Sequence, residues 1–195
     1  MISPPRINEK SFYIELNEVL NTNLVNFFQL RLKKTSTIKK FKIEKKIKKI
    51  CRDNKVKFII NDDPLLAKKL NADGCHLGQN DSTVIKARKL IKKKIIGITC
   101  HNSKKLILKA IKLKVDYIAI GAFFSSKTKK VKYKSKLSIL NYAKSITNIP
   151  IVAIGGINSS NYKKLLLNKA NFLAISGYIW NNNKYKPVEA IKKIK

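Results

Sequence analysis

Short apolar runs recur along the whole chain, and most of them are followed by a longer stretch with helical spacing. The runs are rich in Val, Ile and Phe, whereas the stretches between them carry many lysines. This alternation of strand and helix signals predicts a parallel sheet. We expect eight strands, at Phe12–Leu16, Leu24–Leu30, Lys57–Ile60, Gly74–Leu77, Ile95–Ile98, Tyr117–Ile120, Ile151–Ile154 and Phe172–Ile175.

The stretches between the strands are predicted as helices by their apolar periodicity and their start signals. Asp63 before Pro64 is typical of a helix start, with an N-cap followed by proline at the first helical position. Only Asn17–Asn23 is left to connect the first two expected strands. Helices are expected at Pro64–Leu70, Val84–Lys93, Lys104–Lys114, Leu137–Ile146 and Asn161–Asn168, and a basic amphipathic helix at Phe41–Asp53.

Eight strand–helix units without a Gly-rich dinucleotide loop after the first strand favour a closed barrel over an open sheet. A chain of 195 residues fits one domain, because a second core would leave both halves marginal. The predicted fold is therefore α/β, a single-domain (β/α)₈ TIM barrel with a closed parallel sheet. The domain spans 1–195, and its barrel core covers about 12–180.

The chain is strongly basic, with 43 Lys and Arg against 11 Asp and Glu and a formal net charge of +32. Such a charge is compatible with nucleic-acid binding. However, the cations are spread along the chain and nearly all are lysine, whereas arginine is preferred for base edges. Lys, Ile and Asn are abundant together, as a genome-wide bias toward A and T codons produces. We therefore expect no specific nucleic-acid partner, although anionic small substrates would be attracted.

Several classes of protein are excluded by the apolar and cysteine patterns. No apolar run approaches the roughly 20 residues of a membrane-spanning helix, and the first residues lack the features of a secretory signal. Three cysteines without a CxxC pair, Cys51, Cys75 and Cys100, favour reduced thiols over a disulfide framework. We expect a cytoplasmic protein without membrane contact, and a homo-oligomer is compatible with the sequence.

Polar residues follow the expected strands at the ends where barrel enzymes carry their active sites. Side chains alternate along a strand, so Gln29, Arg31 and Lys33 share one face after the run Leu24–Leu30. This donor-rich group predicts an anion grip. Asp62 and Asp81 follow neighbouring strands and could hold Mg²⁺ beside a diphosphate, or could instead cap the following helices.

The remaining strand ends supply further polar groups. His76 and His101 have no evident partner, so a packing or orienting role is expected for both, whereas Thr99 brings a hydroxyl to the rim. The stretch 121–129 is dense in hydroxyl and ammonium groups and could close over phosphates. Glycines at 155–156 and the Ser176 segment predict a second phosphate site after the last two strands.

Together these segments resemble the thiamine-phosphate synthase family. The resemblance rests on QLRLK at 29–33, IINDD at 59–63, NADGCHLGQND at 71–81, GITCH at 97–101, IGAFFSSKTKK at 120–130 and IPIVAIGGI at 149–157, and runs from about residue 12 to 177. It implies a Mg²⁺-dependent transferase that joins a pyrimidine diphosphate to a thiazole phosphate with release of pyrophosphate. Thiazole tautomerase, another phosphate-binding barrel enzyme and a nucleic-acid-binding protein on an inactive barrel are the alternatives.

The resemblance also implies a role for each matching residue. Pyrimidine-diphosphate contacts fall on Gln29, Arg31, Lys33, Asn61, Thr99 and Lys129, of which Arg31, Lys33, Thr99 and Lys129 are the catalytic contacts. Magnesium ligands fall on Asp62 and Asp81, and thiazole-phosphate contacts on Ser126, Lys127, Thr128, Gly156, Ile175 and Ser176. Thr99 and Ser126 replace the usual serine and threonine. Ala122 and Ser125 replace usual prolines, which should loosen that loop.

Overall fold

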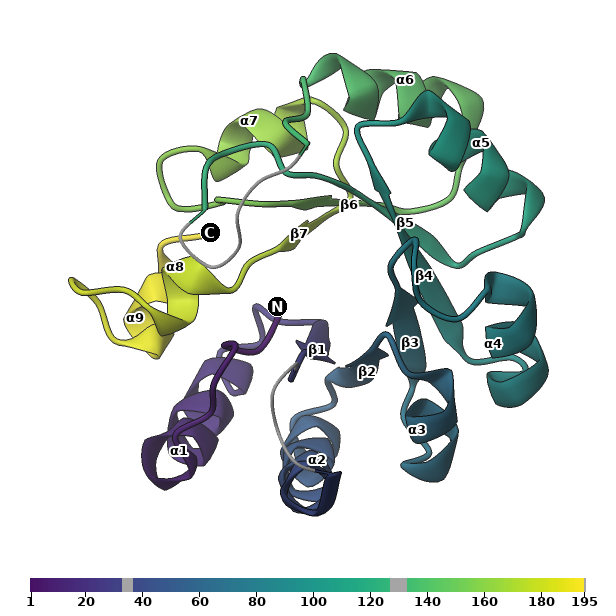
Figure 1. Cartoon of the computed structure of the whole chain (residues 1–195). Coiled ribbons are helices and arrows are strands. Elements are labelled where there is room, and N and C mark those ends of the chain that lie inside the picture. Colours follow the sequence, from purple (N-terminus) through teal and green to yellow (C-terminus); the bar gives the residue numbers. More distant parts are fainter. Residues whose placement is uncertain (33–36, 127–132, 195) are drawn as a thin grey trace.

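The computed structural model describes residues 1–32, 37–126 and 133–194, and within them seven parallel strands form one sheet. Neighbours in the sheet are neighbours in the chain, from first to last. Figure 1 shows the sheet curled around a central axis, so that all strand ends of one kind lie at one edge. The strands are β1 (Phe27–Leu30), β2 (Lys57–Asn61), β3 (Gly74–Leu77), β4 (Ile95–His101), β5 (Tyr117–Gly121), β6 (Ile151–Ile154) and β7 (Phe172–Ala174).

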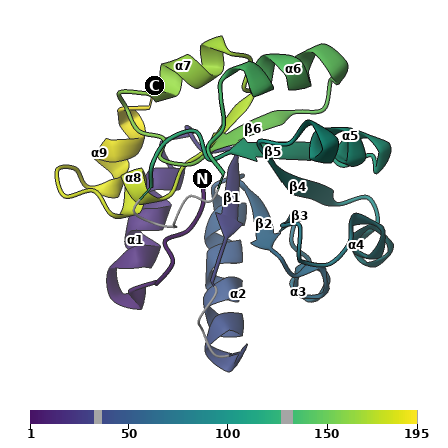
Figure 2. The same ribbon diagram turned by 45° about the horizontal axis from the view of Figure 1, so that its top comes forward.

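Helices cover the outer side of the curled sheet, as Figures 1 and 2 show. The start signal at Asp63 acts as expected, because its side chain accepts a hydrogen bond from the Leu66 N–H. Ser103 caps α5 in the same way, by accepting from the Leu106 N–H. None of these helices is long and apolar enough to cross a membrane in the described part of the chain. The helices are α1 (Glu9–Leu20), α2 (Thr37–Asp53), α3 (Pro64–Lys69), α4 (Val84–Ile91), α5 (Lys104–Lys112), α6 (Ser138–Ile146), α7 (Tyr162–Leu167), α8 (Gly177–Trp180) and α9 (Pro187–Lys192).

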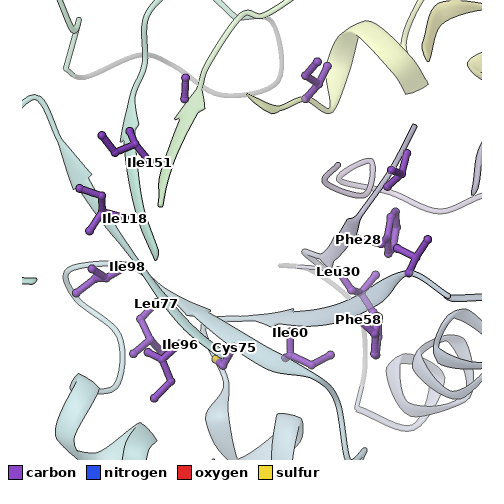
Figure 3. Close-up of a cluster of buried hydrophobic side chains, with 14 of the residues drawn as sticks. Phe28, Leu30, Phe58, Ile60, Cys75, Leu77, Ile96, Ile98, Ile118 and Ile151 are labelled. Carbon is purple, nitrogen blue, oxygen red and sulfur yellow. The ribbon is translucent and has the colours of Figure 1, made fainter. Parts of the chain in front are cut away.

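The main hydrophobic core lies between the outer face of the sheet and the helices. Figure 3 shows its strand side chains pointing away from the enclosed space, among them Phe28 and Phe58. Because side chains alternate along a strand, the intervening residues point inward, which places Gln29, His76 and Thr99 on the inner face. The three cysteines are buried as free thiols.

The first strand expected from the sequence is wrong. Phe12–Leu16 lies inside α1, whose buried residues Phe12, Leu16, Val19 and Leu20 repeat at helical spacing. Asn8 caps this helix by accepting a hydrogen bond from the Lys10 N–H. The apolar run FYIEL is short enough to fit either period, and the caps and the later apolar positions decide for a helix.

The same helix shows that the connection predicted between the first two expected strands is also wrong. Asn17–Asn23 contains the end of α1 rather than a link between strands, and α1 precedes β1. The basic helix expected at Phe41–Asp53 is confirmed but begins at Thr37. Helices α8 and α9, which follow β7, were not expected.

An extended segment, Met1–Ser3, lies between the two edge strands of the sheet. The Ile2 N–H donates to Ile175 O at 2.9 Å, beyond the end of β7. On the other side, the Gln29 N–H donates to Met1 O and the Ser3 N–H to Gln29 O, both at 2.9 Å. The bridge between Ile2 and Gln29 is parallel. The described sheet therefore has seven strands, and Met1–Ser3 contacts both of its edges.

Candidate active site

The strand ends bring most of the expected site residues to one edge of the sheet, here called the carboxyl edge. β1 leads to Arg31, β2 to Asp62 and β3 to Asp81. β6 leads to Gly156 and β7 to Ser176. Lys33, Lys127, Thr128 and Lys129 lie outside the described residues.

The donor-rich group at the end of β1 is hydrogen-bonded to the end of β2. Gln29 donates from its side-chain amide to the Asn61 carbonyl oxygen at 2.6 Å. Both residues were expected to contact the same substrate, and this bond fixes their amides side by side on the inner face. The Arg31 N–H donates to the Ser3 hydroxyl at 2.9 Å, which holds the backbone at the start of the loop.

Two carboxylates stand at neighbouring strand ends, as the sequence predicts. Asp62 has a positive φ of 67° and donates its N–H to His76 O at 2.8 Å, so the backbone of β2 turns sharply beside β3. The Asp81 carboxylate accepts the Gly78 N–H at 2.7 Å. A Cβ on residue 78 would lie 2.5 Å from that oxygen, so glycine is required for this contact.

Neither carboxylate caps the helix that follows it. Thr83, not Asp81, caps α4, and Asp63, not Asp62, caps α3. Asp62 and Asp81 are therefore not the N-caps of the helices that follow them. Burial raises the pKa of the Cys75 thiol to about 12, and the next causes are the charges of three nearby carboxylates, Asp63, Asp62 and Asp81.

A hollow of about 550 Å³ opens beside Asp62 and Asp63. Its wall includes Asn61, Asp62 and Ser82 together with the apolar side chains of Leu32 and Leu65. Polar oxygens and apolar side chains therefore both line a space large enough for part of a small-molecule substrate.

His76 has two hydrogen-bond partners, so the expectation that it lacks one is wrong. Its Nδ1 lies 2.8 Å from the Tyr117 hydroxyl, and its Nε2 lies 2.8 Å from Thr99 Oγ1. Burial lowers the pKa of His76 to about 4, to which Arg31 adds and which Asp81 opposes. Tyr117 was not among the expected site residues. Its position at the start of β5 and the absence of a side chain at Gly97 are the sequence signals for it.

His101 occupies a different environment at the end of β4. Its ring lies against that of Tyr133, with ring centroids 4.6 Å apart. The strand register shifts between Thr99 and His101, and bulges of this kind commonly re-aim side chains next to active sites.

The expected thiazole-phosphate contacts gather where the loops after β5, β6 and β7 meet. Gly156 has a φ of 64°, and a Cβ there would lie 2.2 Å from Ser125 O, so its backbone packs directly against the residue before Ser126. Ile175 is buried after β7, and the Ser176 hydroxyl donates to Ser3 O at 3.0 Å.

The base of the loop after β5 is held by backbone bonds, despite the missing prolines. The Ala122 N–H donates to Tyr133 O at 3.1 Å, and the Ser135 N–H donates to Ala122 O at 2.8 Å. These two bonds hold the backbone of Ala122 against residues that follow the loop. They therefore oppose the loosening that was expected from the missing proline at residue 122.

The two expected substrate regions adjoin at Ser3, which was not predicted from the sequence. Its hydroxyl accepts the Arg31 N–H, and its carbonyl oxygen accepts the Ser176 hydroxyl. Ser3 is almost fully buried. Ser3 therefore joins the end of β1, which carries Arg31, to Ser176 after β7.

Similar proteins share both the sequence and the fold. A thiamine-phosphate synthase of Pelagibacter ubique is 65% identical over 195 residues, covering 100% of this chain and 94% of the relative. That of Erythrobacter litoralis is 38% identical over 170 residues, covering 86% of this chain and 80% of the relative.

Among solved structures, a thiamine phosphate pyrophosphorylase from Pyrococcus furiosus superimposes with a TM-score of 0.86 at 24% identity, covering 99% of this chain and 91% of that one. An orotidine 5′-phosphate decarboxylase from Pyrococcus horikoshii has the same fold, with a TM-score of 0.71 at 14% identity, covering 99% of this chain and 96% of that one. The family described as thiamine monophosphate synthase matches residues 1–179. On this match and on the full-length similarity, the chain belongs to the thiamine monophosphate synthase family.

Proposed function

We propose that this chain condenses 4-amino-2-methyl-5-(diphosphooxymethyl)pyrimidine with 4-methyl-5-(2-phosphooxyethyl)thiazole to give thiamine phosphate and pyrophosphate. Family membership supports the reaction. The observation that carries it to particular residues is the meeting of the two polar regions at Ser3, one through Arg31 and the other through Ser176.

The pyrimidine diphosphate is assigned to the region formed by β1, β2 and β4. The paired amides of Gln29 and Asn61 offer donors and acceptors suited to a flat heterocycle, and Thr99 adds a hydroxyl. Arg31 supplies a guanidinium for phosphate oxygens, with Lys33 and Lys129 as further cations. The thiazole phosphate is assigned to Gly156, Ile175, Ser176, Ser126, Lys127 and Thr128.

The proposed reaction is dissociative. Pyrophosphate leaves first, the electron-rich aminopyrimidine carries the resulting methylene cation, and the thiazole nitrogen then attacks that carbon. The side chains stabilise the departing charge and align the second substrate, so no side-chain base is needed for bond formation.

Asp62 and Asp81 are proposed as ligands of Mg²⁺. Within the described ranges, no group of three or more His, Cys, Asp or Glu side chains is placed to hold a metal ion on its own. Two carboxylates fit Mg²⁺ nevertheless, because this ion usually takes one or two carboxylates together with substrate phosphates. When bound, the ion would neutralise charge on the diphosphate oxygens.

The metal assignment is tested by Asp62→Asn and Asp81→Asn. Both changes remove a charge and keep the shape, and asparagine tolerates the positive φ of residue 62. Each variant should lower Mg²⁺-dependent pyrophosphate release about 100-fold or more, the scale expected for a loss of roughly 2.7 kcal/mol of electrostatic stabilisation, and should keep its thermal unfolding midpoint near that of the wild type.

Asp53→Asn is the matched control, because Asp53 is exposed on α2 and pairs with Lys49 and Arg52. This control should keep normal turnover and normal dependence on Mg²⁺. A normal rate in either Asp62→Asn or Asp81→Asn would remove that residue from the metal site.

The finer architecture, a closed eight-stranded barrel, is also part of the proposal, with Met1–Ser3 in the place of the eighth strand instead of Phe12–Leu16. Its support is the backbone bonding of this segment to β1 and to Ile175. Closure would hold the two substrate regions at a fixed separation.

A further inference from the structure

Three side chains from neighbouring strands form one hydrogen-bonded row on the inner face of the sheet. His76 of β3 stands in the middle, with Tyr117 of β5 on its Nδ1 and Thr99 of β4 on its Nε2, each at 2.8 Å. The rings of His76 and Tyr117 are stacked, with centroids 5.5 Å apart and planes inclined by 21°.

The backbone is shaped to let Tyr117 reach across β4. Gly97 is the register partner of both His76 and Tyr117 in the adjoining strands. A Cβ on residue 97 would lie 1.9 Å from the Tyr117 ring, so any side chain there would displace it. The tyrosine therefore meets the histidine over a gap that only glycine provides.

The direction of the hydrogen bonds follows from acid strength. A neutral imidazole has one N–H donor and one acceptor nitrogen, and either hydroxyl could donate or accept. A phenol is a stronger acid than an alkyl alcohol, so Tyr117 donates to Nδ1. Nε2 then carries the proton and donates to Thr99 Oγ1, and a protonated ring would donate there too.

With the hydrogen bonds in this direction, the Thr99 hydroxyl proton has no acceptor within the row. Thr99 lies two residues beyond Gly97, nearer the carboxyl edge, where Gln79 also donates to its backbone carbonyl oxygen. A hydroxyl that already accepts from His76 is set to donate its own proton to a group at this edge.

We propose that Tyr117 and His76 are positioning residues that fix the Thr99 hydroxyl as a donor to an acceptor atom of the pyrimidine diphosphate. The inference rests on the proposed function, because the contact between Thr99 and this substrate comes from the family resemblance. It adds that recognition of this substrate depends on which ring nitrogen of His76 carries the proton. Tyr117 sets that tautomer, although it is linked to the substrate only through His76 and Thr99.

Kinetics of Tyr117→Phe test the proposal. Loss of one fixed donor should lower kcat/KM for the pyrimidine diphosphate about tenfold, while KM for the thiazole phosphate stays within about twofold. Thr99→Val removes the hydroxyl and keeps the shape. In the Thr99→Val background, Tyr117→Phe should cause less than about a twofold further change, since the row then has no donor to fix.

Equal losses from Tyr117→Phe in both backgrounds would overturn the proposal and leave Tyr117 a packing role only. Activity is compared after each variant's unfolding midpoint has been measured, so that loss of folded protein is not counted. A chain that makes no thiamine phosphate would contradict the proposed function, whereas an active chain unaffected by Tyr117→Phe would contradict this inference alone.

A second measurement does not depend on activity. The chain has only two histidines, so ¹⁵N-labelled histidine gives two ring systems, and His101→Gln identifies that of His76. The proposal predicts a ring protonated at Nε2 and unprotonated at Nδ1 in the wild type, with the other tautomer appearing in Tyr117→Phe. A wild-type ring protonated only at Nδ1 would overturn it.

Discussion

Burial lowers the pKa of His76 to about 4, and this shift links stability to pH. In the unfolded chain the ring takes up a proton below about pH 6.5, so the unfolded state binds more protons between these two values. The contribution of His76 to stability is therefore complete above pH 6.5, declines as the pH falls toward 4, and is constant below.

At pH 5 this loss amounts to about 2 kcal/mol in the free energy of unfolding. We expect urea unfolding in the presence of a chelator to show a smaller decrease from pH 7 to pH 5 in His76→Gln than in the wild type, by about that amount. His101→Gln should keep the full decrease. If the free energy of unfolding depended on pH in the same way in His76→Gln and in the wild type, the lowered pKa of His76 would be contradicted.

At the residue scale, Arg31 is proposed to contact the pyrimidine diphosphate and not the thiazole phosphate. Arg31→Ala should therefore weaken binding of the pyrimidine diphosphate by about tenfold to 100-fold, and binding of the thiazole phosphate much less. Calorimetric titration of each ligand measures both effects. Arg52→Ala, which removes an exposed arginine on α2, is the control and should change neither. Equal losses for both ligands would contradict two distinct regions.

The sequence predicts the positions of residues that lie at or just after the end of a strand. Alternation placed Gln29 on the inner face, and the bond to Asn61 joins two residues expected to share a ligand. The partners of His76 were missed because Tyr117 and Thr99 lie 41 and 23 residues further along the chain. Only the strand register, which no local pattern contains, brings these three side chains together.

At the scale of elements, seven of the eight expected strands overlap observed ones, and the exception is instructive. The apolar residues of Phe12–Leu16 fit the spacing of a strand or of a helix. The helix α1 forms because Val19 and Leu20 continue its buried face. Met1–Ser3 was missed because three residues are too few for a periodic signal. Its structure depends on the edges of two distant strands.

The Met1–Ser3 segment should be detectable through Trp180, the single tryptophan of the chain. The indole N–H donates to Ile2 O at 2.8 Å, and the Ile2 side chain is buried. Ile2→Ala should lower the free energy of unfolding by about 2 kcal/mol or more, through lost burial and the cavity left behind. The loosened contact should shift Trp180 emission to longer wavelength.

Ile14→Ala on α1 is the matched control, because Ile14 is 64% exposed. It should leave both stability and emission close to those of the wild type. Unchanged emission and stability in Ile2→Ala would show that the segment does not hold the edges of the sheet.

At the scale of the whole molecule, the alternating pattern predicted the α/β class and the parallel sheet, and both are observed. A repeating pattern cannot show how a sheet closes, because closure is decided where its first and last strands meet. The net charge of +32 would favour the approach of two anionic substrates. The single domain, the cytoplasmic location and the absence of a nucleic-acid partner stay predictions.

We propose that the two polar regions bind two substrates, which are joined at the carboxyl edge. The most direct test incubates the chain with both substrates and Mg²⁺ and quantifies thiamine phosphate and pyrophosphate in the same sample. With both substrates present we expect the two products in equal amounts. We expect no thiamine phosphate when the thiazole phosphate is left out, and neither product when Mg²⁺ is left out. In the sample that holds both substrates and Mg²⁺, pyrophosphate without thiamine phosphate, or no product from the folded chain, would contradict the proposed joining of the two substrates.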